Sequence, residues 1–204
     1  MYPFNFQQCL QFLDQKGKEL FGPKFKIYIE DHPLIYKHCV YGLKHQAEAD
    51  RLGIDLRKGI LLTGPIGCGK TQLMTLMRYG FPPEQGFVVR SCSQISHQFG
   101  AEGYPVITMY TSESFRRDGL PRTYCFDDLG TEQPVSYFGN ECEVMGEIIL
   151  NRYDYFISAG MITHMTTNLN ADEIGDRYGN RSRSRMREMM NLFSFDAGTK
   201  DRRV

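Results

Sequence analysis

The run Gly-Pro-Ile-Gly-Cys-Gly-Lys-Thr at positions 64–71 has the residue types and spacing of a loop that binds phosphate groups. Its glycines let successive backbone N–H groups point at a phosphate chain, and the helix that follows adds the positive end of its dipole. We expect Lys70 to reach the β- and γ-phosphates and the Thr71 hydroxyl to ligate Mg²⁺. The residues expected to contact the nucleotide are Gly64, Pro65, Ile66, Gly67, Cys68, Gly69, Lys70, Thr71 and Gln72.

Two carboxylates follow an apolar run in the segment Thr-Tyr-Cys-Phe-Asp-Asp-Leu-Gly at 123–130. In a phosphate-binding protein this arrangement allows the first carboxylate, Asp127, to hold the metal ion. The second carboxylate, Asp128, can then act as the base that polarises the attacking water. A solvated acidic turn is the alternative, and the nearby phosphate-binding motif favours the catalytic interpretation.

A later run, Met-Ile-Thr-His-Met-Thr-Thr-Asn at 161–168, ends in polar residues where a strand would meet the nucleotide. Asn168 is expected to hydrogen-bond the γ-phosphate or the attacking water. Asparagine also commonly begins turns, so this pattern alone is weak. We expect His164, in the middle of the run, to be a core histidine.

Five arginines gather between positions 177 and 187, and they are Arg177, Arg181, Arg183, Arg185 and Arg187. Helical spacing places the second and fourth of them on one face, and the third and fifth on another. Three interpretations stay open from spacing alone. The cluster could present an arginine to the phosphates of a neighbouring subunit, contact nucleic-acid phosphates, or form a solvated face neutralised by nearby acids.

Short apolar runs alternate with longer mixed segments after position 58, as in a parallel sheet with crossover helices. The predicted strands are 59–63, 86–90, 123–127, 161–167 and 191–195, with 106–110 as a weaker sixth. The clearest predicted helices are 6–20, 34–52, 71–79 and 144–158. We expect 1–57 to be a helical N-terminal extension that could bind a partner, 58–204 to be the nucleotide-binding domain, and 100–122 to be a surface excursion.

Composition limits the alternatives. The chain has 204 residues, of which 41% are hydrophobic, enough for one compact α/β domain. Lys plus Arg equals Asp plus Glu at 24 each, so any DNA affinity must come from a local basic patch. The six cysteines form no CxxC pair, which disfavours a zinc site and a disulfide framework. With no signal-like or membrane-spanning stretch, we expect a soluble, cytoplasmic protein.

The motifs GPIGCGKT, CFDDLG, TTNL and YGNRSRSRMREM occur in this order, and together they resemble the DnaC-like and IstB-like ATPases. This AAA+ group comprises bacterial helicase loaders and transposition helpers. The resemblance covers roughly 58–204. It implies a three-layer α/β fold of the P-loop NTPase type, with a five-stranded parallel sheet between helices. It also implies ATP with Mg²⁺ at subunit interfaces, homo-oligomers, and partners that include DNA and a helicase or transposase.

Residue roles carried over from the resemblance extend the site. Arg181 matches the arginine finger, Asn168 the first sensor and Arg202 a second sensor, while Arg152 looks structural. The chain departs from larger AAA+ proteins because it ends soon after these motifs and lacks a large C-terminal lid. Aspartate in place of glutamate at 128 predicts modest hydrolysis, since its shorter arm places the base less reliably.

The leading hypothesis is an ATP-hydrolysing assembly factor in DNA replication or mobile-element transposition. One alternative is a nucleotide-dependent switch with little turnover. Another is a small-molecule P-loop kinase, which would need a mobile basic lid, and no convincing lid lies between Asp128 and Asn168.

Overall fold

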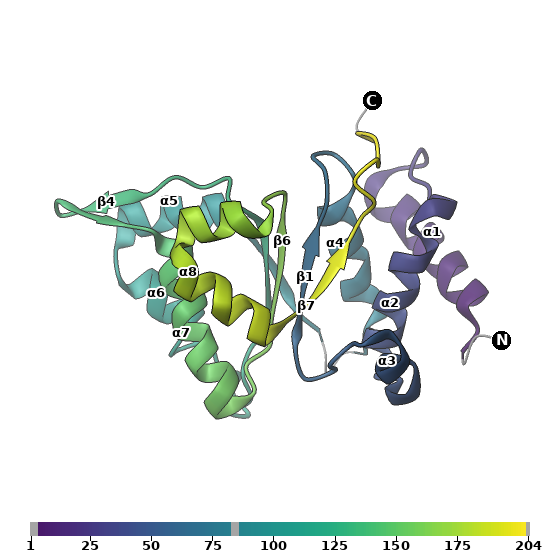
Figure 1. Cartoon of the computed structure of the whole chain (residues 1–204), viewed down its shortest axis with the longest axis horizontal. Coiled ribbons are helices and arrows are strands. Elements are labelled where there is room, and N and C mark those ends of the chain that lie inside the picture. The colour runs from purple at the N-terminus through teal and green to yellow at the C-terminus, as the bar shows by residue number, and fades with distance from the viewer. Residues whose placement is uncertain (1–3, 83–85, 203–204) are drawn as a thin grey trace.

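A parallel five-stranded sheet forms the centre of the computed structural model, which describes residues 4–82 and 86–202 (Figure 1). The strand order is β2-β3-β6-β1-β7, and every neighbouring pair is parallel. The strands are β1 Gly59–Thr63, β2 Val88–Ser91, β3 Tyr124–Leu129, β6 Thr163–Thr167 and β7 Met190–Ser194. Because all five run in one direction, their carboxyl ends share one edge, where the predicted polar residues lie.

Two helical layers cover the two faces of the sheet (Figure 1). The first layer contains α1 Phe6–Phe21, the short 3₁₀ helix η1 Ile29–Asp31, α2 His32–Gly42, α3 Gln46–Leu52 and α4 Lys70–Gly80. The second contains α5 Cys92–Glu102, α6 Pro105–Tyr110, α7 Val144–Ala159 and α8 Ala171–Met189. Alternation along β1 sends Ile60 and Leu62 into the first core and Leu61 into the second. The predicted three-layer α/β fold is confirmed.

Residues 4–57 pack directly on the sheet and on α4. Phe6, Leu10 and Leu13 of α1 share one hydrophobic core with Leu73 and Met74 of α4. The N-terminal segment therefore supplies most of the first helical layer.

Two of the predicted elements were wrong. The helix predicted over 34–52 is two helices, because α2 ends at Gly42 and Lys44 adopts a left-handed conformation with φ of 50°. The weak strand predicted over 106–110 is helical, and Pro105 occupies the first turn of α6, where its missing N–H costs nothing.

Arg152 of α7 is completely buried and organises the surface excursion. Its guanidinium donates to the carbonyls of Tyr110 at 2.7 Å, Arg122 at 3.0 Å and Ile162 at 2.9 Å, and its Nε donates to Thr163 Oγ1 at 2.7 Å. The residue thus ties both ends of the loop that follows α6 to the start of β6, in keeping with its expected structural role.

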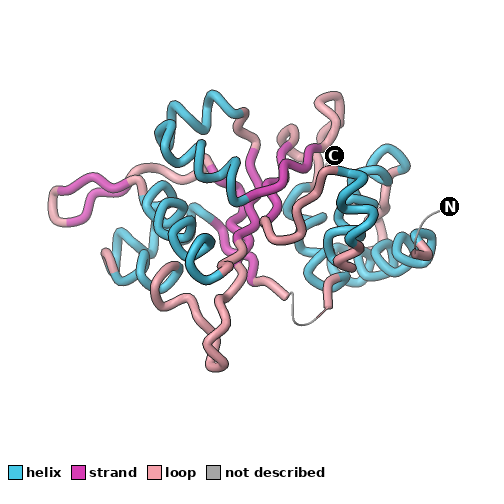
Figure 2. The backbone as a smooth tube through the Cα atoms, turned by 60° about the horizontal axis from the view of Figure 1, so that its bottom comes forward, coloured by secondary structure: helices cyan, strands magenta, loops and turns pink. Residues whose placement is uncertain are grey.

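A hairpin that the sequence did not predict projects from the end of the molecule opposite α1 (Figures 1 and 2). Its strands are β4 Val135–Tyr137 and β5 Asn140–Cys142, paired antiparallel. The turn between them contains Phe138, with φ of 49°, and Gly139, with φ of 82°. The hairpin connects β3 to α7.

No helix in the described parts of the chain is both long and apolar enough to cross a lipid bilayer.

Candidate functional site

The loop between β1 and α4 forms a cradle that only glycine can build at two positions. A Cβ on Gly64 would lie 2.8 Å from Phe195 Cβ, and one on Gly67 would lie 2.1 Å from Asp201 Oδ1. Both residues have positive φ, as does Gly69 with φ of 105° at the N-terminal end of α4. These are the backbone features on which a phosphate chain can rest.

Lys70 lies inside this loop. Its Nζ donates to the carbonyl oxygens of Gly64 and Pro65, each at 2.9 Å, and to Asn168 Oδ1. The ammonium group of one predicted residue and the amide of another, 98 positions apart, therefore meet at the carboxyl edge of β1 and β6.

Thr71 and Asp127 form the second contact between predicted residues. The Thr71 hydroxyl donates to Asp127 Oδ2 at 2.9 Å, and the Thr166 hydroxyl donates to Asp127 Oδ1 at 2.7 Å. Burial raises the pKa of Asp127, and the neighbouring Asp128 adds to this effect, while both hydroxyl donors oppose it. A buried carboxylate beside a hydroxyl is an oxygen donor set that suits Mg²⁺, so the residues present fit this ion.

Asp128 adopts an uncommon backbone conformation, with φ of 56°. Its N–H donates to Thr166 Oγ1 at 2.9 Å, which holds the irregular end of β3 against β6. Its side chain lines the same cavity as Lys70 and Asn168, where a base would have to lie.

Nine of the predicted site residues line a cavity of about 450 Å³, whereas the predicted residues Gly64, Pro65, Asp127 and Arg181 are not among its lining. It is lined by Ile66, Gly67, Gly69, Lys70, Thr71, Gln72, Asp128, Thr131, Asn168 and Arg202. Within the predicted loop, Cys68 is buried beneath the cradle, and burial raises the pKa of its thiol.

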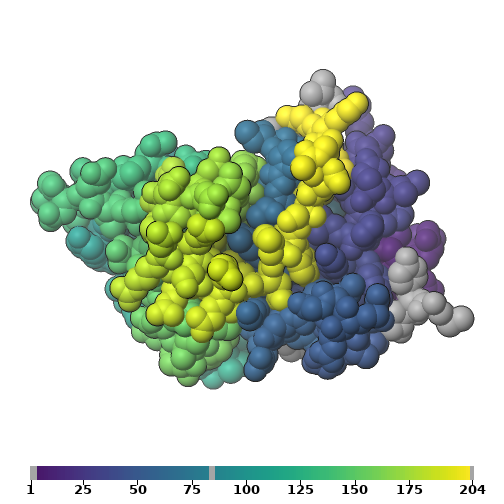
Figure 3. Space-filling view, viewed as in Figure 1, coloured from purple at the N-terminus to yellow at the C-terminus, as the bar shows by residue number. Residues whose placement is uncertain are grey.

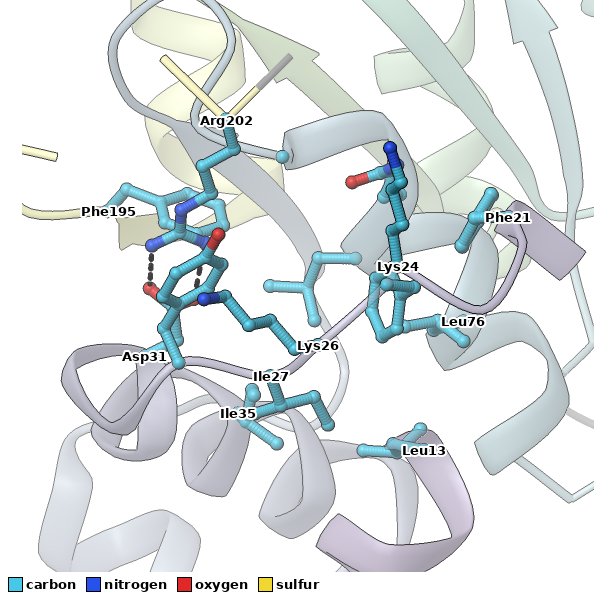
Figure 4. A pocket seen from close by; sticks show the side chains of 15 residues that line it. Leu13, Phe21, Lys24, Lys26, Ile27, Asp31, Ile35, Leu76, Phe195 and Arg202 are labelled. Atoms are coloured by element: carbon cyan, nitrogen blue, oxygen red, sulfur yellow. Dashed lines mark hydrogen bonds and ion pairs between the residues drawn. The ribbon is translucent and has the colours of Figure 1, made fainter. Parts of the chain in front are cut away.

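A second cavity of about 210 Å³ adjoins the first and shares Gly69, Gln72 and Arg202 with it (Figure 4). Its wall is largely aromatic and aliphatic. The remaining lining residues are Leu13, Phe21, Lys24, Phe25, Lys26, Ile27, Tyr28, Asp31, Ile35, Leu73, Leu76 and Phe195. A nucleotide needs a polar compartment for its triphosphate chain and an adjoining, more apolar compartment for its nucleobase.

Arg202 connects the two cavities. Its guanidinium pairs with both carboxylate oxygens of Asp31 and lies 4.2 Å from the centre of the Tyr28 ring (Figure 4). Its backbone N–H donates to the carbonyl of Gly67 at 3.0 Å. The segment after β7 therefore lies on the surface between the phosphate-binding loop and the N-terminal helices (Figure 3).

Sequence reasoning missed Tyr28 and Asp31, which belong to the segment between α1 and α2. The usable signal was the run Lys-Phe-Lys-Ile-Tyr-Ile-Glu-Asp at 24–31, where apolar and charged residues alternate outside any regular helix pattern. Only the three-dimensional structure brings this run beside Gly69 and Gln72.

The arginine cluster divides into paired and unpaired members along α8. Arg177 lies near Glu132 and Glu143, Arg183 lies 3.1 Å from Asp172, and Arg185 lies 3.6 Å from Glu188. The remaining two, Arg181 and Arg187, are exposed and have no acidic partner among the described residues. They are the arginines that remain accessible to a phosphate group outside the subunit.

Glu132 holds the first half of α8 against the turn that follows Asp128. Its buried carboxyl accepts hydrogen bonds from the Gly130 N–H at 3.0 Å and from the Tyr178 hydroxyl, and its carbonyl accepts one from Arg177. Beyond this contact α8 is interrupted at Gly179, which has φ of 83° and ψ of 154°. The carboxyl group of Glu132 thus connects the turn beside the cavity to the first half of α8.

His164 is a core residue, as expected. Its Nδ1 accepts the Ile60 N–H at 3.0 Å, and its ring packs 4.8 Å from that of Phe87. Burial lowers its pKa to about 3, so the imidazole is neutral.

Known structures share this fold. The DnaC helicase loader is 16% identical over 83% of this chain and 92% of that chain, with a TM-score of 0.58. DnaI is 16% identical over 76% and 84%, and AMPPCP-bound DnaA from Aquifex aeolicus is 16% identical over 87% and 50%, each with a TM-score of 0.52. No protein-family model and no curated protein matches the sequence. The likeness at this identity concerns the fold, and it includes a helicase loader, as the motif order led us to expect.

Proposed function

We propose that this chain is a member of the DnaC-like AAA+ group that binds and slowly hydrolyses ATP to control the assembly of a DNA-replication complex. One observation carries the proposal. Lys70, Thr71 and Asn168 line one cavity, Asp127 is hydrogen-bonded to Thr71 beside it, and this cavity adjoins a second compartment with a largely aromatic and aliphatic wall.

In this proposal the triphosphate of ATP lies in the loop at 64–71, where backbone N–H groups and Lys70 offset its charge. The base lies in the adjoining cavity against Tyr28, and Arg202 sits between base and phosphates. Thr71 and Asp127 would hold Mg²⁺, which supplies charge neutralisation for the phosphates when bound.

Two further residues, Asp128 and Asn168, have distinct roles in the proposed hydrolysis. Asp128 accepts a proton from the attacking water, and Asn168 orients the water or the γ-phosphate. Arg181, exposed on α8, reaches the γ-phosphate of a neighbouring subunit in an ATP-dependent homo-oligomer. A role in the site of a neighbouring subunit fits an arginine that has no acidic partner among the described residues of its own chain.

The proposed binding partners are those implied by the resemblance to the DnaC-like AAA+ group. We propose that the protein acts on a replicative helicase, or on a transposase in the mobile-element version of this function, with DNA contacted through exposed arginines of α8. The DnaC helicase loader among the similar structures favours the replication version. Surfaces of residues 1–57 that face solvent are candidates for the partner contact.

Calorimetric titration with ATP and Mg²⁺ tests nucleotide binding. Lys70→Ala is expected to weaken binding at least about 100-fold, because the triphosphate loses its principal cation, whereas the exposed Lys18→Ala should bind like wild type. Absence of heat with folded wild-type protein, for both adenine and guanine nucleotides, would reject the proposal.

Mixing experiments test the interface role of Arg181. When Arg181→Ala is added to wild type, ATPase activity should fall more steeply than dilution predicts, because each defective subunit also disables its neighbour. The exposed Arg187→Ala provides the matched control on the same helix. A linear fall for both variants would argue against the interface role, and binding without turnover in wild type would favour the switch.

A further inference from the structure

The hairpin β4–β5 presents a single large apolar side chain at its tip. Phe138 is 89% exposed, more than any other large hydrophobic residue in the described parts of the chain. Solvent exposure of a whole aromatic ring is unfavourable, and exposed aromatics that are held rigidly are typical anchors of protein interfaces.

The hairpin is fixed on the body of the protein. Tyr137 packs edge-on against Phe138 at 4.7 Å, and on its other side it packs against Phe99 at 5.7 Å and Tyr104 at 6.2 Å. A Cβ on Gly103 would lie 2.3 Å from the Tyr137 ring, so this contact is close. Phe138 is therefore presented in a preorganised position, which reduces the entropy lost on docking.

An apolar groove of about 410 Å³ lies at the other end of the molecule, between α1, α2 and the end of α4. Phe12, Leu43 and Tyr79 line it and are each between 39% and 49% exposed, and Met77 and Phe81 form its floor. Figures 1 and 2 show the hairpin and these helices at opposite ends of the molecule, so the hairpin cannot reach the groove of its own chain.

The charges around the two features are opposite. The strands and turn of the hairpin, 135–142, contain a single charged residue, the exposed Glu141 on β5. At the groove, Arg78 lies 5.4 Å from the centre of the Tyr79 ring, and Lys16, which is paired with Glu19 at 2.8 Å, lies 4.9 Å from it. An acidic aromatic tip and a basic-rimmed apolar groove are complementary in both polarity and charge.

We propose that the β4–β5 hairpin of one copy docks in the α1–α4 groove of a second copy, with Phe138 as the anchor. Because the two surfaces differ and lie at opposite ends, the contact is head-to-tail and leaves a free hairpin and a free groove on every pair. Repetition of the contact produces assemblies larger than a dimer, as a closed ring or an open filament.

Sedimentation velocity without nucleotide tests the docking. Wild type is expected to form species larger than a dimer as concentration rises, whereas Phe138→Glu and Leu43→Lys should each be monomeric. The exposed Ile157→Glu on α7 is the matched control and should assemble like wild type. Circular dichroism melts of all variants verify that they fold.

An equimolar mixture of the two interface variants provides the sharper result. Phe138→Glu keeps its groove and Leu43→Lys keeps its hairpin, so the mixture should give a dimer and no larger species. Wild type that stays monomeric at every concentration, or a Leu43→Lys protein that still assembles, would overturn the proposal. Arg181→Ala should assemble normally in this nucleotide-free assay, which separates this contact from the proposed arginine-finger interface.

Discussion

The two helical layers on either side of the sheet are stabilised by different chemistry. In the first, α1–α4, the packing against the sheet is apolar, and the buried imidazoles of His38 and His164 are held neutral by burial. In the second, α5–α8, the fully buried side chains include the guanidinium of Arg152 and the carboxyl of Glu132. Hydrogen bonds from these fully buried side chains determine the position of loops in the second layer, whereas the loop 53–58 of the first layer is held by the less deeply buried Lys44, which donates to the carbonyl of Leu56 at 2.7 Å.

This difference matches what each layer contributes to the site. The first layer contributes apolar walls to the cavity beside the phosphate-binding loop, where shape matters most. The second layer carries Arg181 and the turn after Asp128, whose orientations need directional contacts such as those of Glu132.

The largest effect is expected from Arg152→Leu in the second layer. Burial lowers the pKa of Arg152 to about 9, and its removal leaves the carbonyls of Tyr110, Arg122 and Ile162 without their donor. We expect the free energy of unfolding in urea to fall by about 3–5 kcal/mol. The exposed Arg181→Ala should change it by less than about 0.5 kcal/mol. Equal effects of the two substitutions would show that the buried guanidinium does not stabilise the second layer.

A smaller effect, on acid stability, is expected from the first layer. Burial lowers the pKa of His38 to about 4, below the roughly 6.5 of an unfolded histidine. The stability contribution of the neutral imidazole is present above pH 6.5 and is lost as the pH falls from there toward 4. Wild type should lose about 2 kcal/mol more than His38→Leu between pH 7 and pH 5. Parallel pH profiles of unfolding free energy would show that the first layer does not depend on this group.

The smallest effect concerns the apolar cavity. Tyr28→Ala should weaken ATP binding roughly tenfold, equal to about 1.4 kcal/mol, because the base loses an aromatic wall. Tyr28→Phe keeps the ring and should bind ATP like wild type. Calorimetry with inorganic triphosphate separates the compartments, since its affinity should be the same in all three proteins. A loss of triphosphate affinity in Tyr28→Ala would show that the two cavities are not separate.

Sequence patterns predicted the phosphate half of the candidate site better than the other half. The loop at 64–71 is contiguous, so its conformation follows from local glycine spacing, and the parallel strands predicted the shared edge where Asn168 meets Lys70. Tyr28 and Arg202 are 174 positions apart and meet only through packing of the chain termini, for which a single sequence contains no local signal.

The errors in the fold have similar physical causes. Residues 106–110 contain β-branched and aromatic side chains that favour a strand, but packing against α5 and α7 overrides this propensity. The hairpin at 135–142 escaped prediction because its strands are only three residues each, with one buried position between them. Short strands leave too few residues for an alternating pattern to be recognised.

The interruption at Gly179 places a kink between the two halves of α8. The half before it is fastened by Tyr178 to Glu132, and the half after it carries Arg181, so the backbone at Gly179 sets the direction of the second half relative to the first. Apart from its chain neighbours and the backbone of its own helix, no described atom lies within 4 Å of a Cβ built at Gly179, so Gly179→Ala would act by penalising the bent geometry. The backbone conformation of this one residue thus determines where α8 presents Arg181 to another subunit.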